Sequence, residues 1–217
     1  MKLSKSCLLL VLIVSIPLVS KGQSNSSESN KENLPIADWN ADVNFKNLRT
    51  EYGAMSRFEE LCDDHQVTQK MVVAMNTKND DDILKYTHIR LGTCPVDIGA
   101  HLYLATALQR KGQSAEMAAH FRWATGLMKS ILDTGDGKSS RTAYEVISIA
   151  EEKQVVSYFR LRIASQSLET SPYRDRIESV DQTGAKQIIY FNPDAYFKRL
   201  QKKLNIKVDL DGVPENK

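Results

Sequence analysis

Apolar residues recur every three or four positions through the first half of the chain, which is the period of an amphipathic helix. Gly92, Pro95 and Gly112 stand between these apolar runs, at positions where helices commonly stop. The pattern therefore predicts helices over residues 57–76, 83–91, 98–110 and 114–132.

The second half of the chain changes to a period of two, which is typical of half-buried strands. Gly184 lies in a polar turn between two such runs and favours a hairpin there. Asn192-Pro193 is a helix start, followed by an apolar stripe. The pattern predicts strands over residues 142–149, 158–168, 174–181 and 186–191, a short helix over 151–156, and a last helix after residue 192.

Together these elements predict an α+β fold in which helical hairpins pack on a small antiparallel sheet with a C-terminal helix. The helical region would cover residues 43–134 and the β region residues 135–205. A flexible tail is expected over 206–217.

The hairpin formed by residues 98–110 and 114–132 resembles a tetratricopeptide unit, because Pro95 stands where a repeat ends and a 34-residue frame starts three residues later. The preceding residues 66–94 fit the frame poorly. Apolar residues that include Phe121 would fill the core face of the second helix. In such units the inner face of the first helix binds partners, and four residues occupy that side here: Leu102, Thr106, Gln109 and Arg110.

Residues 1–22 have the composition of a secretory signal peptide, with basic residues before a 13-residue apolar run and small residues after it. The run is shorter than a membrane span, so we expect export to the periplasm or the extracellular space, with no membrane span after cleavage. Residues 23–42 follow as a disordered linker, polar throughout its first part.

Charge adds little to this picture. The chain has 29 basic and 27 acidic side chains, a formal charge of +2, which is typical of neither a nucleic-acid-binding protein nor an acidic tail protein. Removal of Lys2, Lys5 and Lys21 with the leader would leave 26 basic and 27 acidic residues, or −1. We therefore expect no nucleic acid as a partner, and the repeat-like hairpin favours a protein partner in the envelope.

Two cysteines, Cys62 and Cys94, would remain after cleavage. In an oxidising compartment they could pair across a helical hairpin. The acidic pair Asp63-Asp64 could instead break the first helix and destroy the register. The residues alone leave open whether the two cysteines form a disulfide or remain buried thiols.

The most suggestive chemical group combines His101, His120 and Trp123 with the loop Asp136–Ser139. Facing helices would bring the histidines together, which makes a ligand-binding or hydrolytic site the alternative to an interaction module. The Gly-Lys-Ser of the loop follows a helix, whereas a phosphate-binding loop follows a strand, so we interpret the loop as a helix end with Gly135 in the left-handed conformation. No cofactor, metal site or catalytic set is predicted, and a non-enzymatic role is favoured.

Several motifs resemble a bacterial family named domain of unknown function 4919. They include the Cys94-Pro95 segment, the His120–Trp123 pair, the Gly135–Ser139 loop and the Thr142–Glu152 segment. Lys153 stands where that family usually has an aromatic residue. The resemblance implies an exported or envelope-associated protein with helices followed by a β-rich end, and it supplies no substrate, cofactor or catalytic residue.

Overall fold

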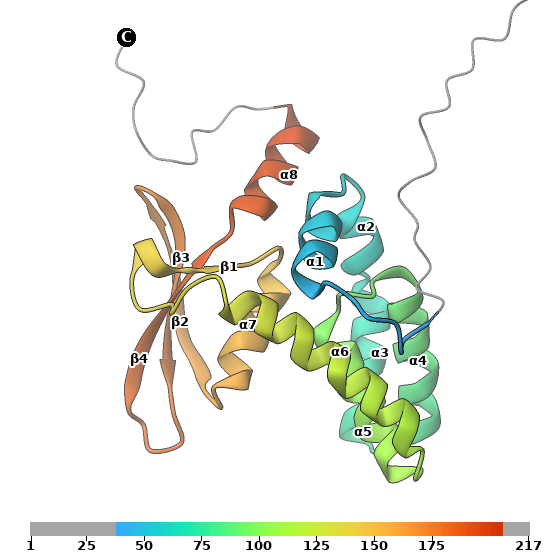
Figure 1. Cartoon of the computed structure of the whole chain (residues 1–217). Helices are drawn as coiled ribbons and strands as arrows, with labels where there is room; N and C mark the ends of the chain where they lie inside the picture. The colour runs from blue at the N-terminus through green and yellow to red at the C-terminus, as the bar shows by residue number, and fades with distance from the viewer. Residues whose placement is uncertain (1–37, 206–217) are drawn as a thin grey trace, which may run out of the picture. The chain divides into compact units, whose positions relative to one another are not determined.

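The computed structural model describes residues 38–205 (Figure 1). The predicted leader, most of the predicted linker and the predicted tail at 206–217 lie outside the described residues. The helices are α1 (Phe45–Ala54), α2 (Phe58–Cys62), α3 (His65–Asn76), α4 (Asp80–Thr93), α5 (Ile98–Arg110), α6 (Ser114–Leu132), α7 (Ile149–Tyr158) and α8 (Asp194–Leu204). The strands are β1 (Tyr144–Glu145), β2 (Arg162–Thr170), β3 (Tyr173–Val180) and β4 (Lys186–Asn192), and a single 3₁₀ turn, η1 (Ser140–Thr142), precedes β1.

Helices α3 to α6 pack consecutively, each against the next in the chain. Small and apolar residues of α5, among them Ala100, Leu104 and Leu108, are buried between its neighbours. The predicted bounds of α5 and α6 are those of the structure. The expected inward position of Phe121 is wrong, because its side chain is 54% exposed and the buried stripe of α6 instead passes through His120 and Trp123.

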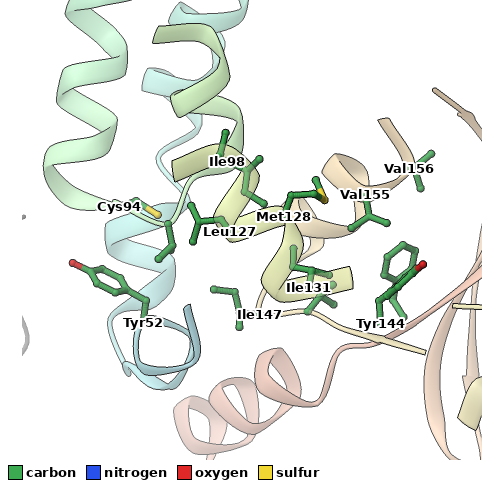
Figure 2. Close-up of a cluster of buried hydrophobic side chains, with 14 of the residues drawn as sticks. Tyr52, Cys94, Ile98, Leu127, Met128, Ile131, Tyr144, Ile147, Val155 and Val156 are labelled. Atoms are coloured by element: carbon green, nitrogen blue, oxygen red, sulfur yellow. The ribbon is translucent and has the colours of Figure 1, made fainter. Parts of the chain in front are cut away.

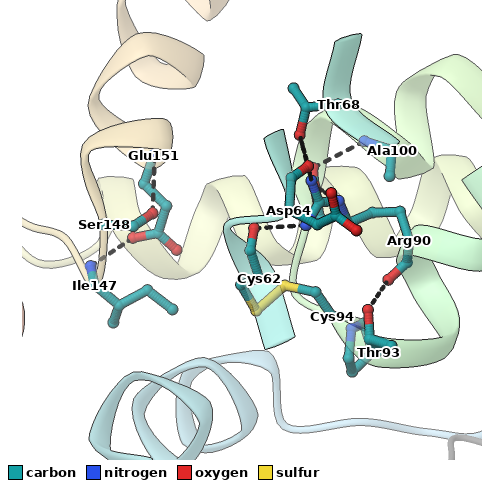
Figure 3. Close-up of a disulfide and its surroundings, with 12 residues drawn as sticks. Cys62, Asp64, Thr68, Arg90, Thr93, Cys94, Ala100, Ile147, Ser148 and Glu151 are labelled. Carbon is teal, nitrogen blue, oxygen red and sulfur yellow. Dashed lines mark hydrogen bonds and ion pairs between the residues drawn. A yellow bond between two sulfur atoms is a disulfide. The ribbon is translucent and has the colours of Figure 1, made fainter. Parts of the chain in front are cut away.

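The single helix predicted over 57–76 is interrupted at Asp63-Asp64. The Asp64 carboxylate accepts hydrogen bonds from the Gln66 and Val67 amides and so begins a new helix, α3. This break does not separate the cysteines: Cys62 and Cys94 form a disulfide that joins the end of α2 to the end of α4 (Figure 3).

The sheet has the order β1-β4-β3-β2. Strands β2, β3 and β4 form the expected antiparallel meander, but β1 pairs with β4 in parallel, so the sheet is mixed and not wholly antiparallel. The strand predicted over 142–149 is reduced to two residues, because the Ser148 side chain accepts from the Glu151 amide and begins α7 at Ile149. The predicted α+β class, with its C-terminal helix, is confirmed.

One apolar core is shared by the helical region and the β region (Figure 2). Its residues come from α5 and α6, such as Ile98 and Leu127, and also from β1, α7 and the sheet, such as Tyr144, Val155 and Ile177. The β region therefore packs against the helical hairpin, as the predicted packing of the hairpins on a small sheet requires.

Candidate functional site

The predicted histidine pair does come together, at the contact between α5 and α6. The Nδ1 atoms of His101 and His120 lie 3.0 Å apart, and the rings are 5.2 Å apart between centroids. The Trp123 ring stacks on His101 at 5.3 Å. All three side chains have 0% relative exposure.

The hydrogen bonds of the pair define its tautomers. The Pro95 carbonyl oxygen lies 2.9 Å from His101 Nε2 and can only accept, so His101 Nε2 carries the proton. In neutral His101 the Nδ1 atom is then the acceptor, and His120 Nδ1 donates to it. His120 Nε2 is left as a buried lone pair without a partner among the described residues. Both rings are neutral in this arrangement.

The Trp39 ring packs against both histidines and covers the pair. Its ring lies 5.2 Å from His101 and 5.1 Å from His120, and its carbonyl accepts hydrogen bonds from Trp123 Nε1 and Arg122 Nη2. Trp39 belongs to the predicted linker 23–42, and its packing against the histidines shows that the end of this segment is part of the fold. The sequence signal was an isolated tryptophan at the end of a polar stretch.

Burial has a direct electrostatic effect on the pair. It lowers the pKa of His101 to about 3, with His120 adding to the effect and the hydrogen bond to Pro95 acting against it. Burial also lowers the pKa of His120 to about 4, with a smaller effect from His88. The pair has 0% exposure in this structure, so its geometry does not support the hydrolytic alternative at these histidines.

The Asp136–Ser139 loop lies far from the histidines. Twelve helical residues separate His120 from the end of α6, which is about 18 Å at 1.5 Å per residue. The Asp136 carboxylate accepts from the Lys138 amide at 3.0 Å and the Thr142 hydroxyl at 2.5 Å, and the Ser139 hydroxyl also pairs with Thr142. The predicted combination of histidines and loop is therefore not one site.

This loop instead connects α6 to the sheet. Gly137, and not Gly135 as expected, has the left-handed conformation, with φ of +66°. The Gly137 carbonyl accepts from the Tyr190 amide of β4 at 2.8 Å. Gly135 is required for a different reason, because a Cβ there would lie 2.3 Å from the Thr142 carbonyl oxygen. The loop thus has a structural role.

Of the four predicted partner-binding residues of α5, some are held by hydrogen bonds within the protein and others are exposed at the surface. Arg110 is held by Asp80 of α4, with its Nε 2.7 Å from the carboxylate, and this hydrogen bond lowers the pKa of Asp80. The Thr106 hydroxyl donates to the Leu102 carbonyl at 2.8 Å. Gln109 is exposed and Leu102 is 36% exposed. Arg110 therefore ties α4 to α5, while Leu102 remains available at the surface.

Leu102 lines a groove that was not predicted from the sequence. A cavity of about 560 Å³ lies between α5, α6 and α7. Three exposed apolar side chains line it: Leu102, Phe121 at 54% exposure and Tyr158 at 57%. The signal in the sequence was the apolar pattern of α6, which includes Phe121 on a face of the helix that the fold leaves exposed.

Between residues 38 and 205, no cluster of three or more histidine, cysteine or acidic side chains could hold a metal ion. Within the same range no helix combines the length and the apolar character needed to cross a membrane.

These features describe an α+β protein with a sealed polar pair and an open apolar groove. A family model described as "Domain of unknown function (DUF4919)" matches residues 48–202. The chain therefore belongs to this family, and the resemblance seen in the sequence is confirmed. Comparisons with curated proteins and with solved structures gave no significant match.

Proposed function

We propose that this protein is a non-enzymatic protein-interaction module of the bacterial cell envelope, and that it binds its partner in the groove between α5, α6 and α7. The observation that carries the proposal is the exposure of Leu102, Phe121 and Tyr158 along one cavity. Exposed apolar side chains that gather in a concave surface commonly mark interaction sites.

The occupant we propose is an amphipathic helix of another envelope protein. The rim of the groove supports an apolar mode of recognition, because Lys129 and Asp133 pair with each other at 2.6 Å and leave no net charge. The remaining polar lining consists of neutral side chains, including Thr125 and Ser157. A groove bounded by three helices suits the apolar stripe of a fourth helix.

The proposed envelope location has two supports. Residues 1–22 have the pattern of a cleavable leader. The Cys62–Cys94 disulfide is the kind of bond that persists in oxidising compartments and is rare in the cytosol.

The groove is tested by a double variant, Phe121→Asp/Tyr158→Asp, with Val73→Asp/Ile89→Asp as the matched control. Val73 and Ile89 are similarly exposed apolar residues, at 60% and 47%, on α3 and α4. A photo-crosslinking side chain at Leu102 would first trap the partner from envelope extracts. We expect the partner's purified helical segment to bind the wild type and the control, and to lose most of its affinity for the groove variant.

Equal binding by the two double variants would contradict the proposed groove. The molar mass of the purified protein, measured by light scattering, tests whether a second copy of the chain occupies the groove. A dimer that dissociates only in the Phe121/Tyr158 variant would show that a second copy covers the groove, and would overturn the proposed occupant. Unchanged circular dichroism would verify that the variants are folded.

A further inference from the structure

A second cavity lies beside the disulfide and shares only Ile98 and Gln154 with the lining of the groove. It has a volume of about 180 Å³ and is formed by α2, the start of α7, α8 and the Cys62–Cys94 bond. Its walls are mainly apolar, with Phe58, Val96 and Ile147 among them. Exposed residues at its edge, including Ala150, place its mouth at the protein surface.

Glu151, a lining residue of this cavity, has one side-chain oxygen without a partner in the described chain. The Glu151 side chain is 6% exposed, and its Oε2 accepts from Arg49 Nη1 at 3.0 Å and from the Ile147 amide at 2.8 Å. Its Oε1 is buried with no hydrogen-bond donor in the described chain. Figure 3 shows this carboxyl group between the start of α7 and the disulfide. Buried acceptors of this kind are nearly always satisfied, so the cavity lacks a donor.

Acidic residues outnumber basic residues in the lining of this cavity. Four acidic residues line it, Glu59, Asp63, Asp97 and Glu151, against the single cation Arg199. Arg199 pairs with Glu59 at 2.8 Å, and two arginines outside the lining pair with Glu151 and Asp97. Each of three acids thus has one arginine, and the fourth, Asp63, is exposed to solvent at the edge of the cavity. Among the buried acids of this lining, Glu151 is the one with an oxygen that lacks a donor in the described chain.

We propose that this cavity binds a primary ammonium group on a short apolar chain, as a lysine side chain presents it. The ammonium group donates to Glu151 Oε1, and the apolar chain lies against Phe58, Ile147 and the disulfide. A volume of about 180 Å³ accommodates a lysine side chain. The inference does not depend on the groove, since the two cavities have different mouths and different exposed residues.

The test uses methyl NMR of the isoleucines in the full-length protein, because Ile98, Ile147 and Ile149 line the cavity while the side chain of Ile189, in β4, lies in the core. The probes are Nα-acetyl-lysine N-methylamide, pentylamine and the neutral analogue Nα-acetyl-norleucine N-methylamide. We expect saturable shifts of the lining isoleucines with a Kd of about 1–10 mM for the lysine probe. The norleucine probe should bind at least about tenfold more weakly, since it lacks a charged hydrogen bond.

Ala150→Trp, which fills the mouth, should abolish these shifts, whereas Ala118→Trp on an exposed face of α6 should retain them. Pentylamine distinguishes the source of the amine: tighter binding of the lysine derivative favours a peptide-borne lysine, and tighter binding of pentylamine favours a free amine. The absence of saturable shifts with either amine would overturn the proposal. Equal affinity for the norleucine probe, or shifts that survive in Ala150→Trp, would also overturn it.

Discussion

The sealed histidine pair makes the stability of this protein depend on pH in a defined direction. Burial holds the folded-state pKa of His101 at about 3 and that of His120 at about 4, against an ordinary value of 6.5. Below pH 6.5 the unfolded chain takes up protons that the folded pair does not. The free energy of unfolding must therefore fall as the pH falls from about 6.5 toward 4.

The size of the effect follows from the same values. At pH 5 each histidine of the unfolded chain lies 1.5 pH units below its ordinary pKa of 6.5, whereas the folded pair stays largely neutral. Each unit is about 1.4 kcal/mol, so His101 costs about 2 kcal/mol and His120 up to the same amount. A total of about 4 kcal/mol is a large part of the 5–15 kcal/mol that stabilises an ordinary domain.

Urea unfolding followed by tryptophan fluorescence at pH 7.5, 6.5, 5.5 and 5.0 measures this loss. Both tryptophans of the chain, Trp39 and Trp123, contact the pair and report on it directly. The control is His101→Phe/His120→Phe, which keeps an aromatic ring at each position, removes both titrating groups and leaves the exposed His65 and His88 in place. The wild type should lose about 4 kcal/mol more than this variant between pH 7.5 and 5. Parallel pH profiles for the two proteins would refute the reasoning.

Three further changes test the packing around the sheet and the disulfide. Cys62→Ala/Cys94→Ala opens a cross-link with a sequence separation of 32, and should lower the free energy of unfolding by about 3–4 kcal/mol in non-reducing buffer. Burial, with the neighbouring Asp175, raises the pKa of Glu152 to about 9, so the folded protein keeps this group protonated above pH 4.5 while the unfolded chain ionises it, and this lowers stability. Glu152→Gln should therefore raise the free energy of unfolding by up to about 3 kcal/mol at pH 7 and leave it unchanged at pH 4. Arg199→Ala should cost about 3–5 kcal/mol, because it leaves Glu59 and two backbone carbonyls without the guanidinium that joins α8 to them.

Each of these outcomes can be contradicted by the same unfolding measurement. The disulfide variant should match the wild type in reducing buffer, and a difference there would assign its loss to packing. A gain for Glu152→Gln that persists at pH 4 would show that ionisation is not its cause. Full rescue by Arg199→Lys would show that charge alone matters, since lysine lacks the planar fork that reaches three acceptors.

Local signals in the sequence were sufficient for the starts of α4 and α5, whereas α1 was not predicted and the helix predicted over 57–76 is two helices. Asp97 caps α5 through the Ala100 amide, and Asn79 caps α4 through the Asp82 amide, as their positions before apolar periodic runs indicate. The turn at Gly184 likewise has the expected positive φ of +87°. These features depend on residues only a few positions apart, so one sequence contains the whole signal.

The candidate sites depended on residues far apart in the chain, and this is why prediction failed there. The approach of His101 to His120 could be inferred from one hairpin, but its closure by Trp39 could not, since no periodic element includes Trp39. Similarly, Arg49 reaches Glu151 across 102 positions. Without that partner, a pair of glutamates at a helix start indicates only a favourable helix dipole.

The start of α7 is where local rules and the structure disagree most, and this has a measurable consequence. Ser148 ends a strand-like run, and Glu151 then stands in the core at 4% exposure with one oxygen unpartnered. An unsatisfied buried acceptor costs about 1–3 kcal/mol, and a donor bound in the cavity would remove that cost. Binding to the folded state alone also raises stability by mass action, by about 1.4 kcal/mol at ten times the Kd. The lysine probe should therefore raise the melting temperature of the wild type but not of Ala150→Trp, and an equal rise in both proteins would mean that the amine binds elsewhere.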